Sequence, residues 1–223
     1  MNYSNARSKY IIIISLVLAL FLSAFYIYES PIKGRVLCFG DSITNGAGAD
    51  GNGWVEQINM KSDSVIFINA GRNGRKTSDK KQLLPILEKY HDIDYVLFLL
   101  GVNDLKDGND SMVAVCVNNM QWMIDRVREK NKNIKIVIMA PCSLSFEKMS
   151  EINKNKKYNT NTEKSLIKLG VKYKELAVKN SVWFIDLFNA VSTENFLDGV
   201  HPNVKGYKQI SDVVWRRLNE MFK

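Results

Sequence analysis

The sequence predicts an α/β fold, in which one doubly wound, five-stranded parallel sheet carries helices on both faces. Two observations support this prediction. From Arg35 onward, short apolar runs alternate with longer amphipathic ones, which is typical of successive βα units. Each short run is apolar along most of its length, as strands are when helices cover both faces of a sheet. Ligands bind such sheets beyond the carboxyl ends of the strands, so functional residues are expected directly after strands.

The expected strands and helices follow from the spacing of apolar residues. The strands are Val36–Phe39, Val65–Asn69, Tyr95–Leu100, Ile134–Ala140 and Val182–Asp186. Apolar side chains recur at helical spacing in three longer segments, 112–127, 166–176 and 207–221. Thr160 and Glu163 have the spacing of a capping box at the start of the second of these helices. Pro202 suits the first turn of the last helix.

Length, charge and cysteine spacing limit the classes of function that the protein can have. The 223 residues, 46% hydrophobic and 24% charged, are enough for one globular domain with a full core. The formal charge of +8 is spread along the chain without a zinc finger or an aromatic-basic RNA motif, so no nucleic-acid partner is expected. The cysteines, Cys38, Cys116 and Cys142, lack the CxxC spacing of a zinc or redox site, and no metal or cofactor is expected.

The N-terminal region contains an uncharged apolar run from Ile11 to Tyr28. As a helix its 18 residues would reach about 27 Å, close to the thickness of a bilayer core. The predicted organisation is a polar tail (1–10), a transmembrane anchor (11–28), a linker (29–34) and a folded domain (35–223). The domain is expected on the extracytoplasmic side. The alternative is a cleaved signal peptide and a secreted or periplasmic protein, with a poor cleavage site at Leu22-Ser23-Ala24.

Four short segments rich in glycine, asparagine and aspartate stand out, and three of them directly follow predicted strands. They are 39–46 (FGDSITNG), 69–74 (NAGRNG), 101–104 (GVND) and 198–202 (DGVHP). In order and spacing these segments resemble the conserved blocks of the SGNH/GDSL hydrolases, whose sheet is flavodoxin-like. The resemblance extends over essentially the whole chain from Val36 onward. One block alone would be weak, whereas four in the right order are specific.

The resemblance implies a role for each matching residue. Ser42 would attack the acyl carbonyl, His201 would take its proton, and Asp198 would hold the imidazole. The oxyanion hole would consist of the backbone N–H groups of Ser42 and Gly74 and the side-chain amide of Asn103. Chemistry of this kind needs no metal and no cofactor.

The residues also support this interpretation without the family. A serine hydroxyl is a weak nucleophile until a base removes its proton, and only histidine changes charge readily near neutral pH. The chain has two histidines. His91 precedes a predicted strand and should lie exposed at the opposite, amino-terminal edge. His201 follows Asp198 by three residues, a separation that can fold a carboxylate back onto the ring.

Structural alternatives exist for most of these residues. Asp198-Gly199 could be an ordinary turn, Gly71 and Gly74 could be turn glycines, and Asn103 could cap a helix. Asp41 and Asp104 could suggest paired carboxylates or a metal site, but neither has a partner at ligand spacing. Cys142 follows the fourth predicted strand and could be a thiol nucleophile, but it lacks a partner histidine of its own.

Two features bear on the substrate. Arg72, Arg75 and Lys76 lie beside Gly74 and could bind a substrate carboxylate or phosphate, or could simply be surface charge. The long polar segment 141–159 could be a lid or specificity loop, or could contain a short helix.

The predicted function is a serine esterase that hydrolyses carboxylic esters or thioesters through an acyl-enzyme. The first choice of substrate is a short acyl group, such as O-acetyl, on a small-molecule, glycan or other envelope ester. The alternatives are an O-acyltransferase with the same triad, a lysophospholipase or acyl-thioesterase, and a non-catalytic glycan-binding module. The membrane would be a partner through the N-terminal helix, and the sequence does not indicate an oligomeric state.

Overall fold

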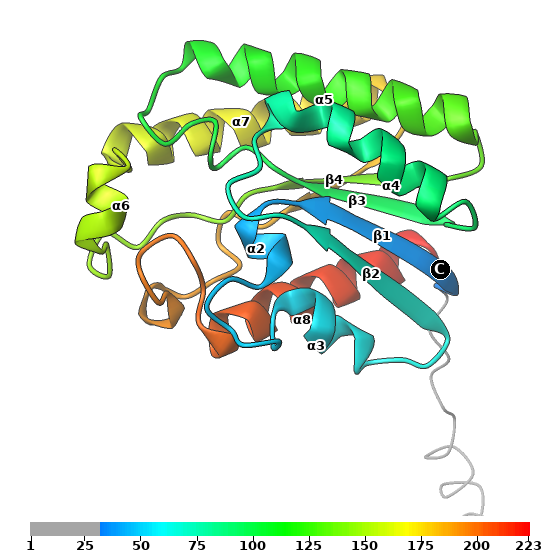
Figure 1. The fold of residues 1–223 in the computed structure, drawn as a ribbon, viewed down its shortest axis with the longest axis horizontal. Helices are drawn as coiled ribbons and strands as arrows, with labels where there is room; N and C mark the ends of the chain where they lie inside the picture. The colour runs from blue at the N-terminus through cyan, green and yellow to red at the C-terminus, as the bar shows by residue number, and fades with distance from the viewer. Residues whose placement is uncertain (1–31) are drawn as a thin grey trace, which may run out of the picture. The chain divides into compact units, whose positions relative to one another are not determined.

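A computed structural model describes residues 32–223, which fold around one five-stranded sheet. The strand order is β2-β1-β3-β4-β5, and all neighbouring strands are parallel (Figure 1). The strands are β1 (Gly34–Gly40), β2 (Val65–Gly71), β3 (Tyr95–Leu99), β4 (Lys135–Ala140) and β5 (Trp183–Asp186). The predicted parallel sheet is confirmed, and each strand lies within two residues of its predicted bounds. The α/β class follows from this sheet and the helices that join its strands.

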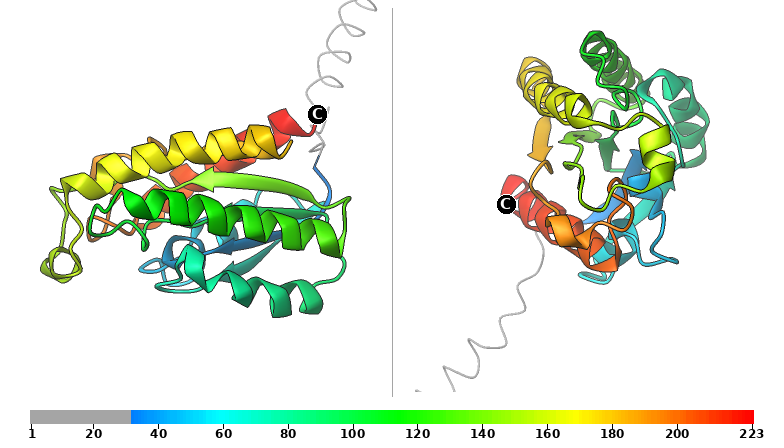
Figure 2. Two further views of the ribbon diagram at one scale, coloured as in Figure 1. Left: turned by 90° about the horizontal axis from the view of Figure 1, so that it is seen from above. Right: turned by 90° about the vertical axis from the view of Figure 1, so that its left-hand side faces the viewer.

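Helices cover both faces of the sheet. The views in Figures 1 and 2 place α4, α5 and α7 over one face, and α3 and α8 over the other. The helices are α2 (Ser42–Asn45), α3 (Trp54–Asn59), α4 (Leu83–Lys89), α5 (Ser111–Lys130), α6 (Glu151–Asn155), α7 (Thr160–Lys179) and α8 (Val204–Met221), with 3-10 turns η1 (Thr77–Gln82) and η2 (Thr193–Asn195). Most of the apolar stripes predicted on α5, α7 and α8 are buried against the sheet.

The register of the sheet decides where functional residues can gather. Gly34 pairs with Val65 and Gly40 with Gly71, so β1 and β2 end at the same level. β3 ends beside them, because Gly40 also pairs with Leu99. In Figure 1 the strand arrows point towards α2 and α6, which lie beyond this carboxyl edge. His91 precedes β3 at the other edge and is exposed, as predicted.

Two helix starts differ from the prediction. The N-cap of α7 is Asn159, whose side chain accepts hydrogen bonds from the backbone of Asn161 and Thr162. The Thr162 hydroxyl completes the capping box by accepting from Asn159 N–H, so the predicted Thr160 and Glu163 pair is wrong. α8 begins after Asn203, and Pro202 therefore precedes its cap instead of lying in its first turn. Asparagine is as good an N-cap as serine and explains both shifts.

The predicted polar tail (1–10) and apolar segment (11–28) lie outside the described residues. Between Ile32 and Lys223 the helices are too short or too polar to cross a bilayer. Ile32 is fully buried and β1 already begins at Gly34, so the folded domain starts inside the predicted linker (29–34). Burial of an isoleucine explains this earlier start.

Candidate active site

Ser42 lies at the first position of α2, immediately beyond the end of β1. The Asp41 side chain caps this short helix by accepting a 2.9 Å hydrogen bond from Ile43 N–H. A Cβ at Gly40 would stand 2.0 Å from Thr44 Oγ1, so α2 packs directly on the strand that precedes it. These contacts fix the serine at the carboxyl edge of the sheet, where only 6% of it is exposed.

Asp198 and His201 occupy the loop between η2 and α8. One carboxylate oxygen of Asp198, Oδ1, accepts the backbone N–H groups of Val200 at 3.0 Å and His201 at 2.8 Å. Phe196 and Pro202 form an antiparallel bridge that closes the loop. The carboxylate is thereby folded back over its own turn, which leaves Oδ2 directed at the imidazole.

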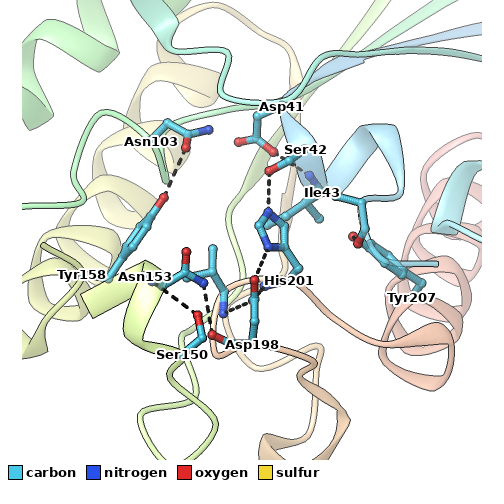
Figure 3. A network of polar contacts seen from close by, with 12 residues as sticks. Asp41, Ser42, Ile43, Asn103, Ser150, Asn153, Tyr158, Asp198, His201 and Tyr207 are labelled. Atoms are coloured by element: carbon cyan, nitrogen blue, oxygen red, sulfur yellow. Dashed lines mark hydrogen bonds and ion pairs between the residues drawn. The ribbon is translucent and has the colours of Figure 1, made fainter. Parts of the chain in front are cut away.

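The three side chains form a continuous hydrogen-bonded row (Figure 3). His201 Nε2 lies 2.9 Å from Ser42 Oγ, and His201 Nδ1 lies 2.8 Å from Asp198 Oδ2. Burial alone would raise the pKa of Asp198, but the hydrogen bonds from the ring and backbone of His201 hold it well below its ordinary value. An ionised Asp198 accepts from Nδ1–H, so Nε2 is left to accept the serine proton. This arrangement can activate an alcohol as a nucleophile.

Two backbone N–H groups at the site, those of Ser42 and Gly74, have no hydrogen-bond acceptor in the described protein. Within residues 32–223, neither Ser42 N–H nor Gly74 N–H donates to a protein acceptor. Gly74 has φ +76°, a left-handed conformation that favours glycine, whereas a Cβ there would meet nothing within 4 Å. The left-handed backbone conformation therefore explains why residue 74 is a glycine, because a side chain there would have room. Both groups are available to an oxyanion.

The Asn103 amide is held by two hydrogen bonds. Its Nδ2 donates to Arg75 O at 3.1 Å, and its Oδ1 accepts from Tyr158 Oη at 3.2 Å. An amide nitrogen carries two protons, so one N–H remains after the bond to Arg75. In Figure 3 the nitrogen of Asn103 lies on the side of Ser42 and its oxygen on the side of Tyr158. The remaining proton is thus a third donor beside the serine.

A cavity of about 330 Å³ joins these groups. It is lined by Ser42, Ala47, Asn73, Gly74, Lys76, Asn103, Lys106, Asn153, Lys156, Tyr158 and His201. The four predicted residues Ser42, Gly74, Asn103 and His201 are therefore brought together, with Asp198 behind His201. Asn153, Lys156 and Tyr158 were not predicted. Their only signal was the polar segment 141–159, expected to leave this edge of the sheet.

Segment 141–159 is a wall of the site that contains the short helix α6. Ser150 N–H and Asn153 Nδ2 both donate to Asp198 O at 3.1 Å. At Gly199, φ is +87° and a Cβ would stand 2.6 Å from Met149 Cα. The segment is therefore hydrogen-bonded to the Asp198 loop and packed on it. This arrangement favours a specificity element that contains a short helix, and it does not favour a lid detached from the site.

Arg72 and Arg75 do not line the cavity, in contrast to the predicted substrate-binding role. Arg75 is 5% exposed, and its Nη1 donates to the carbonyls of Gly40 and Ala70 at 2.6 Å each. Its guanidinium also lies 4.1 Å from the ring centroid of Phe39. These contacts hold the ends of β1 and β2 together, so the role of Arg75 is structural. Arg72 is exposed outside the cavity.

The other reactive groups near the site have local partners. Burial raises the pKa of Asp41 to about 7 while its carboxyl caps α2. Asp104 accepts from both the N–H and the hydroxyl of Thr77. Burial also raises the pKa of Cys142 to about 12, which keeps this thiol protonated. None of these groups forms a hydrogen bond with Ser42 Oγ within the described chain, so the row with His201 is the arrangement suited to nucleophilic chemistry.

Comparison with known proteins gives a family match. The profile of the GDSL-like Lipase/Acylhydrolase family matches residues 38–209, more than half of the chain. Among curated proteins, no significant sequence match was found.

Solved structures of low sequence identity share the fold. A carbohydrate acetylesterase family member from Sinorhizobium meliloti has 22% identity, with a TM-score of 0.73, over 86% of this chain and 99% of that one. Est24, a carbohydrate acetylesterase from the same organism, has 21% identity and a TM-score of 0.73, over 85% and 100% of the two chains. The aryl esterase of M. smegmatis has 20% identity and a TM-score of 0.70, over 85% and 99%.

Proposed function

Because the chain belongs to the GDSL-like lipase/acylhydrolase family, we propose that this esterase cleaves its substrates through an acyl-enzyme on Ser42. The single observation that carries the proposal is the row Ser42–His201–Asp198, with contacts of 2.9 and 2.8 Å at the wall of a cavity. A nucleophile, a base and the group that orients the base lie within hydrogen-bonding distance, as acyl transfer requires.

Each step has a residue to perform it. His201 Nε2 takes the proton of Ser42 as Oγ attacks the ester carbonyl, and Asp198 stabilises the imidazolium that forms. The carbonyl oxygen becomes an oxyanion within reach of Ser42 N–H, Gly74 N–H and Asn103 Nδ2. His201 then gives its proton to the departing alcohol, which leaves an ester on Ser42. Water, activated by the same imidazole, hydrolyses this ester and restores the serine.

The cavity supports a short acyl group, with O-acetyl on a glycan as the first choice. Its volume is about 330 Å³, and Ala47 is its one aliphatic lining residue. Long acyl chains are bound by extended apolar surface, so a lysophospholipase or long-chain thioesterase is less well supported. Two of the solved structures with this fold are described as carbohydrate acetylesterases, which agrees with this choice.

The test is a chain-length series with a serine variant. The purified full chain should release p-nitrophenol from the acetate ester faster than from the butyrate and octanoate esters. Ser42→Ala should lower kcat by roughly ten-thousandfold or more, because the remaining groups supply only oxyanion and binding contributions. Ser78→Ala, an exposed serine in η1, is the matched control and should retain activity. Full activity in Ser42→Ala would exclude the mechanism.

An O-acyltransferase would use the same acyl-enzyme and differ only in what resolves it. The two are separated by incubating the enzyme with an acetyl donor and an oligosaccharide acceptor, and measuring product mass. Free acetate in the presence of acceptor supports the hydrolase. A gain of one acetyl group on the acceptor, in preference to free acetate, supports the transferase.

A further inference from the structure

Three lysines surround the cavity, and they come from three separate segments. Lys76 lies between β2 and η1, Lys106 follows β3, and Lys156 follows α6. None of them forms an ion pair with another residue of the described domain. The lining contains no aspartate or glutamate. The cavity wall therefore carries three lysines and no acidic residue.

Three carboxyl groups close to the site lie outside its lining and have partners or a buried position within the protein. Asp198 pairs with His201, and Asp104 accepts from Thr77. Asp41 is buried with its pKa raised to about 7, which reduces its charge near neutral pH. None of these three carboxyl groups lines the cavity. Asp104 attracts Lys76 electrostatically from behind the wall, but none of the three lysines has an ion-pair partner within the described domain. Their ammonium groups can therefore meet a ligand from solvent.

Other surface cavities of the domain show a different balance of charge. A cavity near β5 and α7 contains Asp186 beside Lys174, and one on α5 contains Asp110 beside two lysines. In the second case Lys168 pairs with Asp110 at 3.0 Å. Basic residues in these hollows thus have an acidic neighbour. A further cavity beside β5 and α8 also has more basic than acidic lining residues, but its Arg216 and Arg217 both pair with Glu220. Among these four cavities of the described domain, only the active-site cavity has several basic residues and no acidic one in its lining.

We propose that the substrate is an anionic ester, which carries a carboxylate or phosphate group close to the acyl group that is removed. This inference rests on the proposed function. A lysine ammonium is a compact charge with three donors on a flexible stem, suited to a carboxylate or phosphate whose position varies. Like-signed charges around a cleft also raise the local concentration of an oppositely charged ligand. An acidic acetylated carbohydrate has this chemistry.

The experiment compares esters that differ in charge. Methyl 4-acetoxybenzoate is neutral, 4-acetoxybenzoate carries a carboxylate, and 4-acetoxyphenyl phosphate carries a phosphate. The selectivity is the kcat/KM for each anionic ester divided by that for the neutral one, measured with the full chain. Replacing Lys76, Lys106 and Lys156 together by glutamine should lower this selectivity about tenfold, since each exposed charge contributes a few-fold at most. The ester with the larger loss identifies carboxylate or phosphate as the preferred group.

The control variant is Lys179→Gln, an exposed lysine at the last residue of α7 and outside the cavity lining. It should leave the selectivity unchanged. Raising the salt concentration should reduce the selectivity of the wild type, because exposed charges are screened within about 10 Å at 0.1 M salt. The three single lysine variants, each with a smaller loss, test the proposal even if the triple variant fails to fold.

The outcomes separate the two proposals. If the wild type hydrolyses the neutral ester and Ser42→Ala does not, but the lysine variants keep the selectivity of the wild type, the anionic substrate is excluded and the esterase mechanism stands. If no ester of the series is hydrolysed, both proposals fail. A selectivity that falls in the lysine variants and in salt, and not in Lys179→Gln, supports the anionic substrate.

Discussion

Asp41 shows how a residue beside the nucleophile meets two opposing demands. Its carboxyl caps α2 at 2.9 Å from Ile43 N–H, yet it is only 1% exposed. Burial disfavours the charged form and raises the pKa to about 7. An acid whose pKa is higher in the folded state than in the unfolded chain binds more protons when folded. The stability it contributes is therefore present at acidic pH, and is lost as pH rises from about 4 to about 7.

Replacing Asp41 by asparagine should remove this pH dependence while keeping the cap. The amide oxygen can still accept from Ile43 N–H, and the amide does not ionise. We expect the free energy of unfolding of Asp41→Asn, relative to the wild type, to rise by up to a few kcal/mol between pH 5 and pH 8. Urea unfolding at several pH values measures it. A constant difference across this range would contradict the raised pKa.

At the residue scale, the positions of the reactive groups could be predicted from the sequence, whereas the residues that surround them could not. Ser42, His201 and Asp198 lie in short motifs beside strand or helix ends, so the strand order alone brings them to one edge. Tyr158 reaches Asn103 Oδ1 at 3.2 Å across 55 residues of sequence. No local pattern encodes such a contact. Arg75 was misjudged for the same reason, because its carbonyl partners become close only when β1 and β2 pair.

At the element scale, the position of α2 depends on how closely β2 approaches it. A Cβ at Gly71 would stand 2.2 Å from Asn45 N and 2.6 Å from Thr44 C. These are backbone atoms of the helix that carries the nucleophile, and they cannot rotate away as a side chain would. The last residue of β2 is therefore a glycine because α2 packs against it, which the sequence motif alone does not reveal.

Gly71→Ala should consequently damage both stability and activity. The added methyl group overpacks the contact, and we expect a loss of about 1–3 kcal/mol in the free energy of unfolding. A shift of α2 would also move Ser42 from His201 and lower kcat up to about a hundredfold. The measurements are thermal or urea unfolding and p-nitrophenyl acetate hydrolysis.

Gly170→Ala is the matched control for this substitution. Gly170 lies within α7, where a Cβ would meet Ala140 Cβ at an ordinary 3.5 Å. Alanine is the better helix former, so we expect a gain of about 0.5–1 kcal/mol and unchanged activity. If both variants lost stability equally, close packing at Gly71 would not be the cause.

Helix boundaries were the least predictable feature at this scale. Asn159 and Asn203 cap α7 and α8, whereas the sequence predicted a capping box at Thr160 and Glu163 and put Pro202 in the first turn of the last helix. A capping box needs a short polar side chain at the cap and, three residues on, a side chain that accepts from the backbone N–H of the cap. Segment 157–163 contains two such pairs, Asn159 with Thr162 and Thr160 with Glu163. Burial of Thr162, which is fully enclosed, favours the pair that forms. Tertiary packing therefore selects among caps of similar local strength.

At the scale of the whole molecule, the periodicity of apolar residues sufficed for the fold. Buried parallel strands are apolar on both faces and short, and the amphipathic helices between them leave few alternatives to a doubly wound sheet. The order of the strands makes the carboxyl edge the place for a site. The shape and charge of the cavity did not follow from this, because Lys76, Lys106 and Lys156 converge only in the folded domain.

Attachment to a membrane is the remaining proposal at this scale, and it depends on segment 11–28. This segment is an uncharged apolar run of 18 residues, long enough as a helix to span a bilayer core. We propose that it is an uncleaved anchor. The full chain, expressed in a bacterial host, should then sediment with membranes and be released by detergent.

High salt and an N-terminal mass measurement distinguish this anchor from its alternatives. The net charge of +8 could adsorb the protein to anionic lipids, but such binding is screened by salt, whereas an inserted helix is not. Retention after a 1 M salt wash, together with loss of sedimentation when residues 1–29 are removed, supports the anchor. A soluble product whose mass corresponds to cleavage after Ala24 would show instead that the segment is a signal peptide, since a removed segment can no longer hold the enzyme at the membrane.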